Sequence, residues 1–476
     1  MKRYIALFLL AAILAGSVSC GGEGTTALTS GTEDTETTTA AETEANIYEK
    51  LRNIDLDGYE FNILTYDTSN WDAFIAPETE TGDVLNDTAF KRNLEVENLL
   101  NVAITVQKED IEKYETTFRN LVMSGDAESI DLIVLWSPGQ RIKYITENLA
   151  YDWRKLPYVD LDAEYYNKTA NEAYTVDGKQ YFAVSDFTYA IQQHWRILFS
   201  KRLAADFSVS SPYDAVFDGT WTFDRLVSDI KNVTVDLNSN GKADLEDRFG
   251  LIANPHTTAA FMFGFGESPV MFGDNGAEFS LNTESFTDKI TKLVGLCDNP
   301  DVFINKNGND QYQNFYAGNS LYMPYSSDPA LLREIDVDFG YLPYPKWDEA
   351  QENYVVWAAG GMMALPSTLN NPERSGAVVE ALSIASGKYL KDAFVEKYIE
   401  GKVLRDDESV KVYRMMRENM TYEVSYNLDP SGKLTDLAYY RYFITNKSTD
   451  TASYWAKNSE KIINSYSDFL ASVGQD

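Results

Sequence analysis

Asp131-Leu132-Ile133-Val134-Leu135-Trp136-Ser137-Pro138-Gly139 is the stretch that decides the fold of this 476-residue chain. Residues 132–135 form a short, continuously apolar run, which is typical of a parallel strand buried on both faces of a sheet. The Ser-Pro-Gly sequence behind Trp136 ends the run, because proline and glycine punctuate regular structure. The stretch therefore predicts a strand in the interior of a sheet, with Trp136 at its carboxyl end.

Strands and helices are predicted to alternate on the amino-terminal side of this stretch. β-rich, roughly alternating segments predict strands at 61–66 and 102–106. Apolar residues at helical spacing predict helices at 88–100 and 111–123. Strands that alternate with helices are typical of an α/β domain with a largely parallel sheet.

The carboxyl-terminal side of the chain continues with similar patterns. Asp177-Gly178-Lys179 predicts a turn that leads into a strand at 181–184, and 224–231 has a helical pattern. Further predicted segments are strand-like at 339–344 and 354–365, and mainly helical at 371–416 and 434–473. A chain of this length is too long for one compact core and is expected to form two or three domains.

The composition is that of an acidic globular protein. Hydrophobic residues make up 44% and aromatic residues 13% of the chain, which is enough for a large core and an aromatic-lined cleft. The formal net charge of −32 disfavours nucleic acid and anionic lipid as partners, because like charges repel. Cys20 and Cys297 are the two cysteines, and Cys297 is expected to be a small buried residue in a helix without a disulfide partner.

The amino terminus has the pattern of a leader. Lys2 and Arg3 precede an apolar run at 5–14 and then small residues, which predicts a signal peptide at 1–19. Ser17-Val18-Ser19-Cys20-Gly21-Gly22 resembles a bacterial lipobox, which implies a lipid on Cys20, although that motif usually has Leu where Ser17 stands. The alternative is an ordinary secretory signal cut near Ser19, which would release a soluble protein.

Residues 20–46 are predicted to join the lipid to the folded part. The segment from 21 onward is mostly Gly, Thr, Glu and Ala without any aromatic residue, so it cannot bury enough apolar surface to fold. We expect a flexible tether. No other stretch approaches the roughly 18 uninterrupted apolar residues that a membrane-spanning helix needs, so the lipid is the expected membrane attachment.

Short motifs then follow one another from about residue 59 to the C-terminus. They are 131–136, 147–150, 176–181, 199–202, 220–226, 315–320, Met323, 339–345, 365–367 and 371–373. In this order, the chain resembles the family 1 extracellular solute-binding proteins, the group that includes maltose-binding protein.

The resemblance implies an α/β, two-lobe periplasmic-binding-protein type II fold with a hinge and an inter-lobe ligand cleft. Lobe 1 would hold 58–186 plus 362–415, and lobe 2 would hold 187–358 plus 416–476. It further implies a monomer outside the cytoplasm, anchored by lipid to the outer face of the bacterial cell membrane. Such a protein would close by hinge motion on an extracellular solute, with a sugar or oligosaccharide favoured, and deliver it to ABC permease subunits.

Sugars suit such a cleft because aromatic rings cover their C–H faces, while carboxylates and amides satisfy their hydroxyls. Ligands in α/β sheets lie at the carboxyl ends of strands. The candidate ligand contacts, each with the alternative of a packed or solvent-side role, are Asp67, Trp71, Trp136, Asp186, Tyr325, Asp328, Trp357 and Trp455. Trp221, in contrast, is expected to pack the start of a helix.

The segment 236–247 has the spacing of a calcium-binding loop. Side-chain oxygens fall at loop positions 1, 3, 5, 9 and 12, and glycine stands at position 6. The predicted ligands are the side chains of Asp236, Asn238, Asn240, Asp244 and Asp247 and the carbonyl oxygen of Lys242. A structural Ca²⁺ is therefore expected, with a loop of solvated carboxylates as the alternative.

The sequence favours a binding protein over an enzyme. His194 and His256 are the only histidines and do not form a His-Glu-x-x-His motif. Neither a Gly-x-Ser-x-Gly elbow nor a phosphate-binding P-loop occurs. We therefore expect no catalytic residue and no catalytic cofactor. The alternatives are a surface glycan-binding adhesin without transport and a secreted carbohydrate-active enzyme, since a glycosidase needs only two carboxylates.

Overall fold

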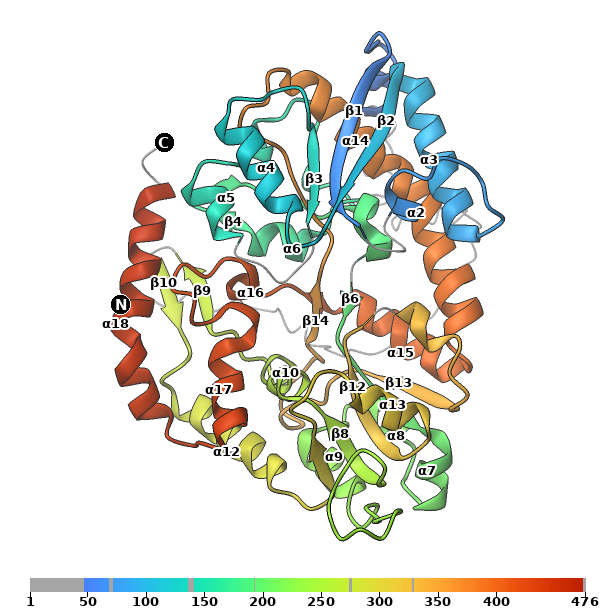
Figure 1. Cartoon of the computed structure of the whole chain (residues 1–476), viewed down its shortest axis with the longest axis vertical. Coiled ribbons are helices and arrows are strands. Elements are labelled where there is room, and N and C mark those ends of the chain that lie inside the picture. Colours follow the sequence, from blue (N-terminus) through green and yellow to red (C-terminus); the bar gives the residue numbers. More distant parts are fainter. Residues whose placement is uncertain are drawn as a thin grey trace, which may run out of the picture.

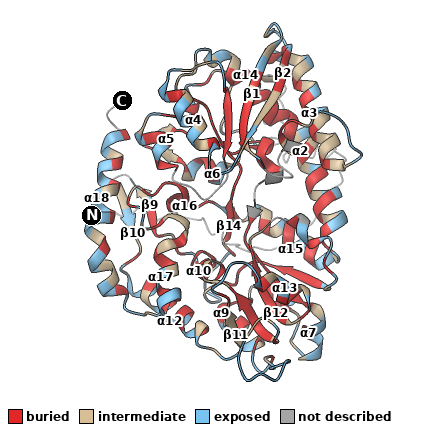
Figure 2. Cartoon of the chain, viewed as in Figure 1, coloured by how far each residue is buried: buried red, intermediate tan, exposed pale blue. Residues whose placement is uncertain are grey.

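The structure, a computed structural model, describes residues 47–67, 72–135, 141–191, 193–273, 276–327 and 329–473. Two separate sheets form the centres of two bodies, an upper and a lower one in Figure 1. Figure 2 shows that the strands of both sheets are mostly buried, whereas the exposed residues lie on the outer faces of helices. Cys20, Trp71, Trp136 and Asp328 lie outside the described residues.

The first sheet has four strands in the order β15-β3-β1-β2. β1 (Tyr59–Tyr66) pairs in parallel with β2 (Val102–Glu109) and with β3 (Leu132–Leu135), as the alternation of strands and helices predicted. β15 (Met362–Ala364) comes from far along the chain and pairs with β3 in the antiparallel sense. The predicted interior strand at 132–135 is therefore confirmed, with strands on both sides.

Both faces of this sheet are covered by helices. Ile63 and Val134 pack on one face in a core that α14 (Pro372–Ser386) closes. Leu64 and Ile133 pack on the other face with apolar residues of α4 (Tyr114–Met123). The alternation follows from the strand period of two, which sends neighbouring side chains to opposite faces.

The second sheet has five strands in the order β11-β8-β12-β7-β13. β8 pairs in parallel with β11 and β12, whereas β7 runs antiparallel to both of its neighbours. The strands are β7 (Arg196–Ser200), β8 (Phe249–Ala253), β11 (Val302–Ile304), β12 (Ser320–Tyr325) and β13 (Phe339–Leu342). Trp221 is fully buried beside this sheet and donates from Nε1 to the carbonyl oxygen of Pro343 at 3.0 Å, so it packs as predicted.

Three short strands connect the bodies. β14 (Val356–Ala359) pairs with β6 (Gln193–His194) and with β16 (Met420–Thr421). Figure 1 shows β6 and β14 between the upper and the lower body, where the chain passes from one to the other. This arrangement is the two-lobe α/β fold with a hinge that the sequence led us to expect.

The remaining elements complete the two bodies. The helices are α2 (Asp72–Ile75), α3 (Val84–Leu100), α5 (Ile142–Thr146), α6 (Lys168–Ala173), α7 (Lys201–Asp206), α8 (Pro212–Phe217), α9 (Phe223–Asp229), α10 (Pro255–Ala259), α11 (Phe261–Gly264), α12 (Glu284–Cys297), α13 (Gln311–Tyr316), α15 (Asp407–Glu418), α16 (Val424–Asn427), α17 (Ala438–Asn446) and α18 (Thr451–Val473). Short 3₁₀ turns are η1 (Trp153–Lys155), η2 (Asp186–Ile191), η3 (Pro329–Leu332) and η6 (Thr435–Leu437). Two hairpins join β4 (Thr175–Val176) to β5 (Lys179–Gln180) and β9 (Val270–Gly273) to β10 (Gly276–Phe279).

The predicted strand at 181–184 is wrong. Ala183 forms only a single antiparallel bridge with Met363, and no strand covers 181–184. The β-rich composition reflects burial here, because Tyr181, Phe182 and Val184 all pack in the core. The turn predicted just before it is confirmed at Asp177 and Gly178, both of which have positive φ.

The helical region predicted at 371–416 is continuous only in part. α14 passes into the π-helical segments η4 (Gly387–Lys391) and η5 (Ala393–Val403) before α15 begins. α15 packs on β13 and α8, so it lies with the five-stranded sheet. The lobe boundaries, which assigned residues up to 415 to lobe 1, stay predictions.

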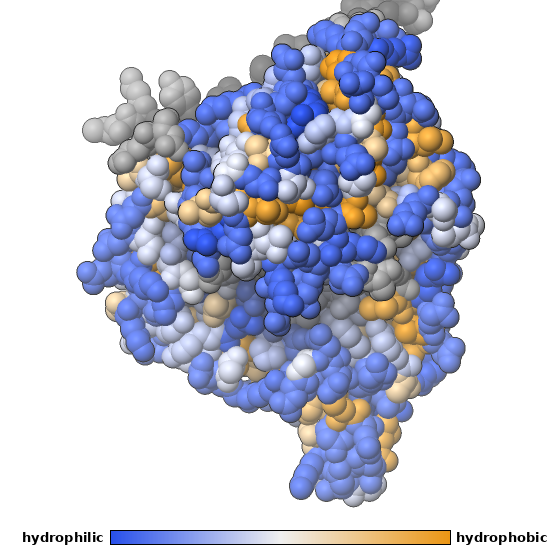
Figure 3. Space-filling view, turned by 45° about the horizontal axis from the view of Figure 1, so that its top comes forward, coloured by the Kyte–Doolittle hydropathy of each residue, from blue (hydrophilic) through white to orange (hydrophobic). Residues whose placement is uncertain are grey.

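The visible surface is mostly hydrophilic. Figure 3 shows one face on which hydrophilic residues predominate and apolar residues gather in small patches. Within the described ranges, no helix has both the length and the apolar character to cross a bilayer. Cys297 ends α12 in a partly buried position, and burial is the main cause that raises its pKa to about 11.

Candidate functional site

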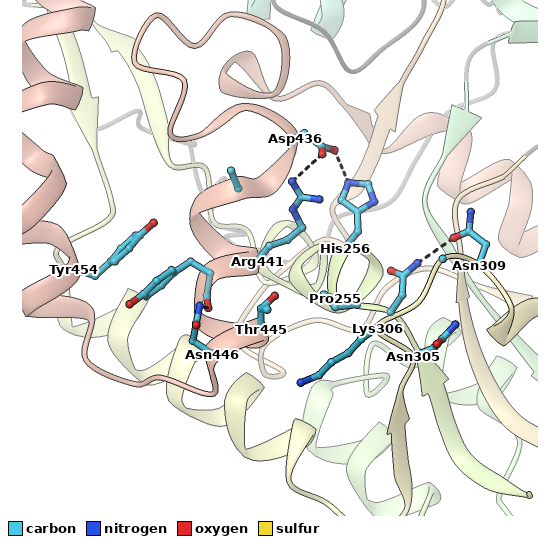
Figure 4. Close-up of a pocket in the computed structure, with 14 residues that line it drawn as sticks. Pro255, His256, Asn305, Lys306, Asn309, Asp436, Arg441, Thr445, Asn446 and Tyr454 are labelled. Atoms are coloured by element: carbon cyan, nitrogen blue, oxygen red, sulfur yellow. Dashed lines mark hydrogen bonds and ion pairs between the residues drawn. The ribbon is translucent and has the colours of Figure 1, made fainter. Parts of the chain in front are cut away.

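A pocket of about 710 Å³ opens in the second lobe between α10, the loop after β11 and α17 (Figure 4). It lies at the carboxyl ends of β8 and β11, the edge at which open α/β sheets bind ligands. Its lining residues are Asn254, Pro255, His256, Asn305, Lys306, Gly308, Asn309, Asp436, Ala438, Arg441, Tyr442, Thr445, Asn446 and Tyr454. Amides, charged groups and aromatic rings are thus gathered in one concave site.

The sequence around α10 fixes the near wall of the pocket. Asn254 caps the helix, because its Oδ1 accepts from the N–H of Thr257 at 2.8 Å and its own N–H donates to the Thr257 hydroxyl. Pro255 at the first helical position is preorganised for the turn. The Asn254 amide also donates to Asn309 Oδ1 at 3.1 Å. The cap therefore holds His256 and the loop that contains Asn309 in fixed positions.

Asp436 is the centre of a polar network at the top of the pocket in Figure 4. Its carboxylate lies 2.9 Å from Nε2 of His256 and 2.9 Å from a guanidinium nitrogen of Arg441. Burial alone would raise the pKa of Asp436. The hydrogen bonds and charges of its partners, which include the Tyr426 hydroxyl, outweigh burial and lower this pKa below its ordinary value. Asp436 is therefore a carboxylate that its neighbours keep charged.

The backbone around Asp436 is unusual. Asp436 has φ 54° and Leu437 has φ 60°, so two consecutive residues other than glycine adopt the left-handed conformation. Such residues cost free energy and persist where surrounding structure holds them, often at functional sites. Here the bend turns the chain into α17 and presents the Asp436 carboxylate to His256.

Tyr442 and Tyr454 stack on the other side of the pocket. Their ring centroids lie 3.8 Å apart with an interplanar angle of 17°. Tyr442 is 37% exposed, so part of its surface is open to the pocket that it lines. Together with the surrounding amides, the pair offers a flat apolar surface beside hydrogen-bonding groups.

A cluster of rings lies behind the pocket at the hinge. Trp195 lies 4.7 Å from the ring of His256 and 4.5 Å from the ring of Trp357, and Trp357 lies 4.4 Å from Tyr426. Trp357, a predicted ligand contact, is only 3% exposed. The structure thus places it in the packed wall between the crossing strands, where it contacts Tyr426 directly and His256 only through Trp195.

The other predicted ligand contacts that are described do not line the main pocket. Asp67 is exposed directly after β1, and Tyr325 is fully buried with the guanidinium of Arg196 4.7 Å from its ring centroid. Trp455 is partly buried on α18 and packs on Phe279 with the centroids 6.0 Å apart. These three residues lie on different elements and do not form one site.

Asp186 lines a second, smaller pocket of about 260 Å³ near the hinge. It is buried, and Nζ of Lys391 lies 3.6 Å from its carboxylate. Burial is the largest cause that raises the pKa of Asp186 to about 6, although the positive charges of Lys391 and Arg417 oppose the shift. The structure therefore separates Asp186 from the pocket that contains Asp436.

The predicted calcium loop folds as a compact turn. Asp236 accepts from the N–H groups of Asn240 and Gly241, the latter at 2.8 Å, and Asn240 Nδ2 donates to Asp244 at 2.6 Å. Asp247 is buried and accepts from two backbone N–H groups of the loop, and Asn238 also donates to Asp244. Among the described residues, no three or more His, Cys, Asp or Glu side chains gather to hold a metal. A cation here would need the oxygens of Asn238, Asn240 and the Lys242 carbonyl as well.

Solved structures share this fold. An ABC substrate-binding protein from Listeria monocytogenes in complex with cycloalternan is 15% identical, with a TM-score of 0.54, and the match covers 88% of this chain and 100% of that one. A cyclo/maltodextrin-binding protein complexed with maltotetraose is 12% identical, with a TM-score of 0.57 and coverage of 87% and 97%. The maltose/maltodextrin-binding domain from Bdellovibrio bacteriovorus bound to maltotriose is 15% identical, with a TM-score of 0.54 and coverage of 87% and 100%.

These matches establish the class of fold. The chain has the two-lobe fold of the solute-binding proteins of ABC transporters, and it resembles those of the maltodextrin-binding kind, as the order of sequence motifs led us to expect. No protein-family model matches the sequence, and no curated protein sequence matches it either.

Sequence analysis missed most of the pocket. His256 and Asp436 were not among the candidate ligand contacts, and neither were Tyr442 and Tyr454. The Asn254-Pro255 pair is a helix-start signal that could have marked His256 as the first-turn residue of a strand-end helix. No local signal marks Asp436, because its position depends on a left-handed bend that the residue type does not favour.

Proposed function

We propose that this protein captures an extracellular sugar or oligosaccharide between its lobes and delivers it to an ABC importer. The observation that carries the proposal is the pocket at the carboxyl ends of β8 and β11 in a two-lobe body. The described lining of this pocket comes from the second lobe, and the first lobe would close over it. Several amides and the Asp436 carboxylate line it beside the Tyr442–Tyr454 stack. A pyranose needs such a combination, with a flat apolar surface for its C–H face and polar groups for its hydroxyls.

The neighbours in fold support the same conclusion. Proteins of this fold are bound to cycloalternan, maltotetraose and maltotriose in the solved structures. The paired strands β6 and β14 connect the two bodies, and the bodies can close on a ligand about this connection.

The described lining of the pocket does not favour an enzymatic function. Asp436 is the one carboxylate among the described residues that line it, and it is already engaged by His256 and Arg441. Glycoside hydrolysis uses a pair of carboxyl groups on either side of the scissile bond. We therefore propose binding without chemical conversion.

The proposed test is calorimetric titration of the purified full-length protein with soluble oligosaccharides, together with product analysis of each mixture. Binding with one-to-one stoichiometry and unchanged sugar is expected. Release of smaller sugars would show an enzyme. Binding only to insoluble polymer would show an adhesin, and the absence of any binding to carbohydrates would refute the proposal.

We further propose that a lipid on Cys20 holds the protein at the outer face of the cell membrane. The support is the leader pattern at 1–19, the lipobox-like sequence around Cys20 and the polar segment that follows it. In cells that process lipoproteins, Cys20→Ala is expected to move the protein from the membrane fraction to the medium. An unchanged distribution would contradict the anchor.

We also propose that the loop 236–247 binds a structural Ca²⁺. The spacing of its oxygen-bearing side chains and the compact turn around Gly241 support this. The loop follows α9 and ends at β8, whose carboxyl end borders the pocket. The cation would therefore stabilise the second lobe without contacting the ligand.

A further inference from the structure

The pocket between α10, the 305–309 loop and α17 has a charge opposite to that of the whole chain. The chain contains 73 acidic and 41 basic residues. In contrast, the described lining of the pocket contains two permanent cations, Lys306 and Arg441, and a single carboxylate, Asp436. If the lining of the pocket had the average charge of the chain, acidic residues would outnumber basic residues in it.

The carboxylate of this pocket is already neutralised inside the protein. Asp436 forms an ion pair with Arg441 at 2.9 Å, lies 2.9 Å from Nε2 of His256, and also accepts from the Tyr426 hydroxyl. Its hydrogen-bonding capacity toward a ligand is therefore largely used. The positive charge of the pocket is balanced only in part, since one carboxylate faces two cations.

Lys306 carries the unbalanced charge. Within the described part of the chain, no carboxylate lies within 4.0 Å of its ammonium group. Figure 4 shows its side chain extended across the lower part of the pocket, away from Asp436. A neutral sugar would gain little from this ammonium group, because water already solvates it. An anionic group would gain a charge-assisted hydrogen bond.

We infer that the ligand of this pocket is an anionic sugar, one that carries a carboxylate or sulfate group, and that Lys306 binds this group. The inference rests on the proposed function and names the chemical class of its ligand. The Tyr442–Tyr454 stack would cover the sugar ring while the amides satisfy its hydroxyls. The remaining donors of Arg441, which is 36% exposed in its ion pair with Asp436, would assist Lys306.

The test compares matched sugars. The purified full-length protein is titrated with galactobiose, with digalacturonate and with a sulfated galactobiose, at low and at high salt. At least one anionic disaccharide is expected to bind about tenfold more tightly than the neutral one, as a charge-assisted hydrogen bond allows. The advantage should shrink at high salt, because the group is exposed. The two anionic arms distinguish carboxylate from sulfate, and a preference for either supports the inference.

Variants then assign the effect to Lys306. Lys306→Gln is expected to lose about tenfold in affinity for the preferred anionic sugar, as loss of one charged donor predicts, while Lys306→Arg retains most of it. Lys461→Gln, on the exposed face of α18, is the matched control and should bind like the wild type. Equal or tighter binding of the neutral sugar would overturn the inference and leave the proposed function standing. Failure of all soluble sugars to bind would instead overturn the proposed function.

Discussion

The N–H of Trp195 donates to the carbonyl oxygen of Trp357 at 2.9 Å, and the two indole rings lie 4.5 Å apart between centroids. Trp195 follows β6 and Trp357 belongs to β14, so the pair joins two of the segments that cross between the lobes. Both side chains are buried, and Trp357 also packs on Phe263 at 4.6 Å. The segments that cross between the lobes are therefore packed in an ordered aromatic cluster.

Trp357→Ala is expected to destabilise the protein by about 3–5 kcal/mol, because it leaves a large cavity in a packed cluster. Urea denaturation measures the change in the free energy of unfolding. Trp455→Ala is the matched control, since this partly buried tryptophan on α18 contacts fewer rings and should cost less. If Trp357→Ala kept its stability but lost sugar binding, Trp357 would be a ligand contact, as its sequence position predicted.

Tyr442→Ala is expected to weaken sugar binding by about tenfold, on the scale of about 1 kcal/mol that aromatic packing contributes. Its exposed fraction of 37% means that the fold should lose little stability. Tyr442→Phe keeps the ring over Tyr454 and is expected to bind nearly as well as the wild type. Calorimetric titration of both variants checks this. Equal affinities for the Ala and Phe variants would show that the stacked pair does not contact the sugar.

The fold was predictable because it depends on patterns that are local. The apolar run 132–135 needs only the strand period and burial on both faces to be recognised. The segment 181–184 has an equally β-rich composition, yet Ala183 forms only one bridge, with Met363. Met363, the partner of Ala183, belongs to β15 and lies about 180 residues further along the chain. Pairing over such distances has no local signal, so burial was mistaken for strand formation.

The pocket was less predictable for the same reason. His256 follows β8 and Asp436 precedes α17, and the two meet only because both chain segments border the same sheet edge. A left-handed Asp436 is not indicated by its residue type. Tyr325, in contrast, stands at a predicted strand end and was a candidate ligand contact, but it is buried beneath Arg196. Position at a strand end therefore pointed to the sheet edge that borders the pocket, without showing which side chains line it.

Glu380 is expected to make stability depend on pH. It is fully buried in α14 and accepts from the hydroxyls of Tyr165 and Tyr166 and from the N–H of Asp160. Burial is the main cause that raises its pKa to about 7. The folded state therefore holds a proton that the unfolded state releases near pH 4.5. Its contribution is fully present below that value and is lost as the pH rises through about 7.

The measurement is urea denaturation of the wild type and of Glu380→Gln between pH 4.5 and 7.5. The wild type is expected to lose on the order of 3 kcal/mol more stability over this range than the variant, because each pKa unit corresponds to about 1.4 kcal/mol. Asp186 and Glu423 titrate in the same range and are present in both proteins, so the difference isolates Glu380. Parallel pH profiles would show that Glu380 keeps an ordinary pKa.

Calcium is expected to raise the melting temperature of the wild type by a few degrees, because a cation that binds only the folded loop stabilises it by mass action. Asp244→Asn should abolish this shift, since it removes a ligand charge while Asn240 and Glu246 can still hydrogen-bond to the side chain. The hydrogen bond from Asn240 is the main cause that lowers the pKa of Asp244, so its carboxylate is charged and available at neutral pH. Glu352→Gln, at an exposed position outside the loop, is the control and should keep the shift. Thermal unfolding with 1 mM Ca²⁺, Mg²⁺ or a chelator distinguishes the cases, and an identical response of both variants would place any calcium outside this loop.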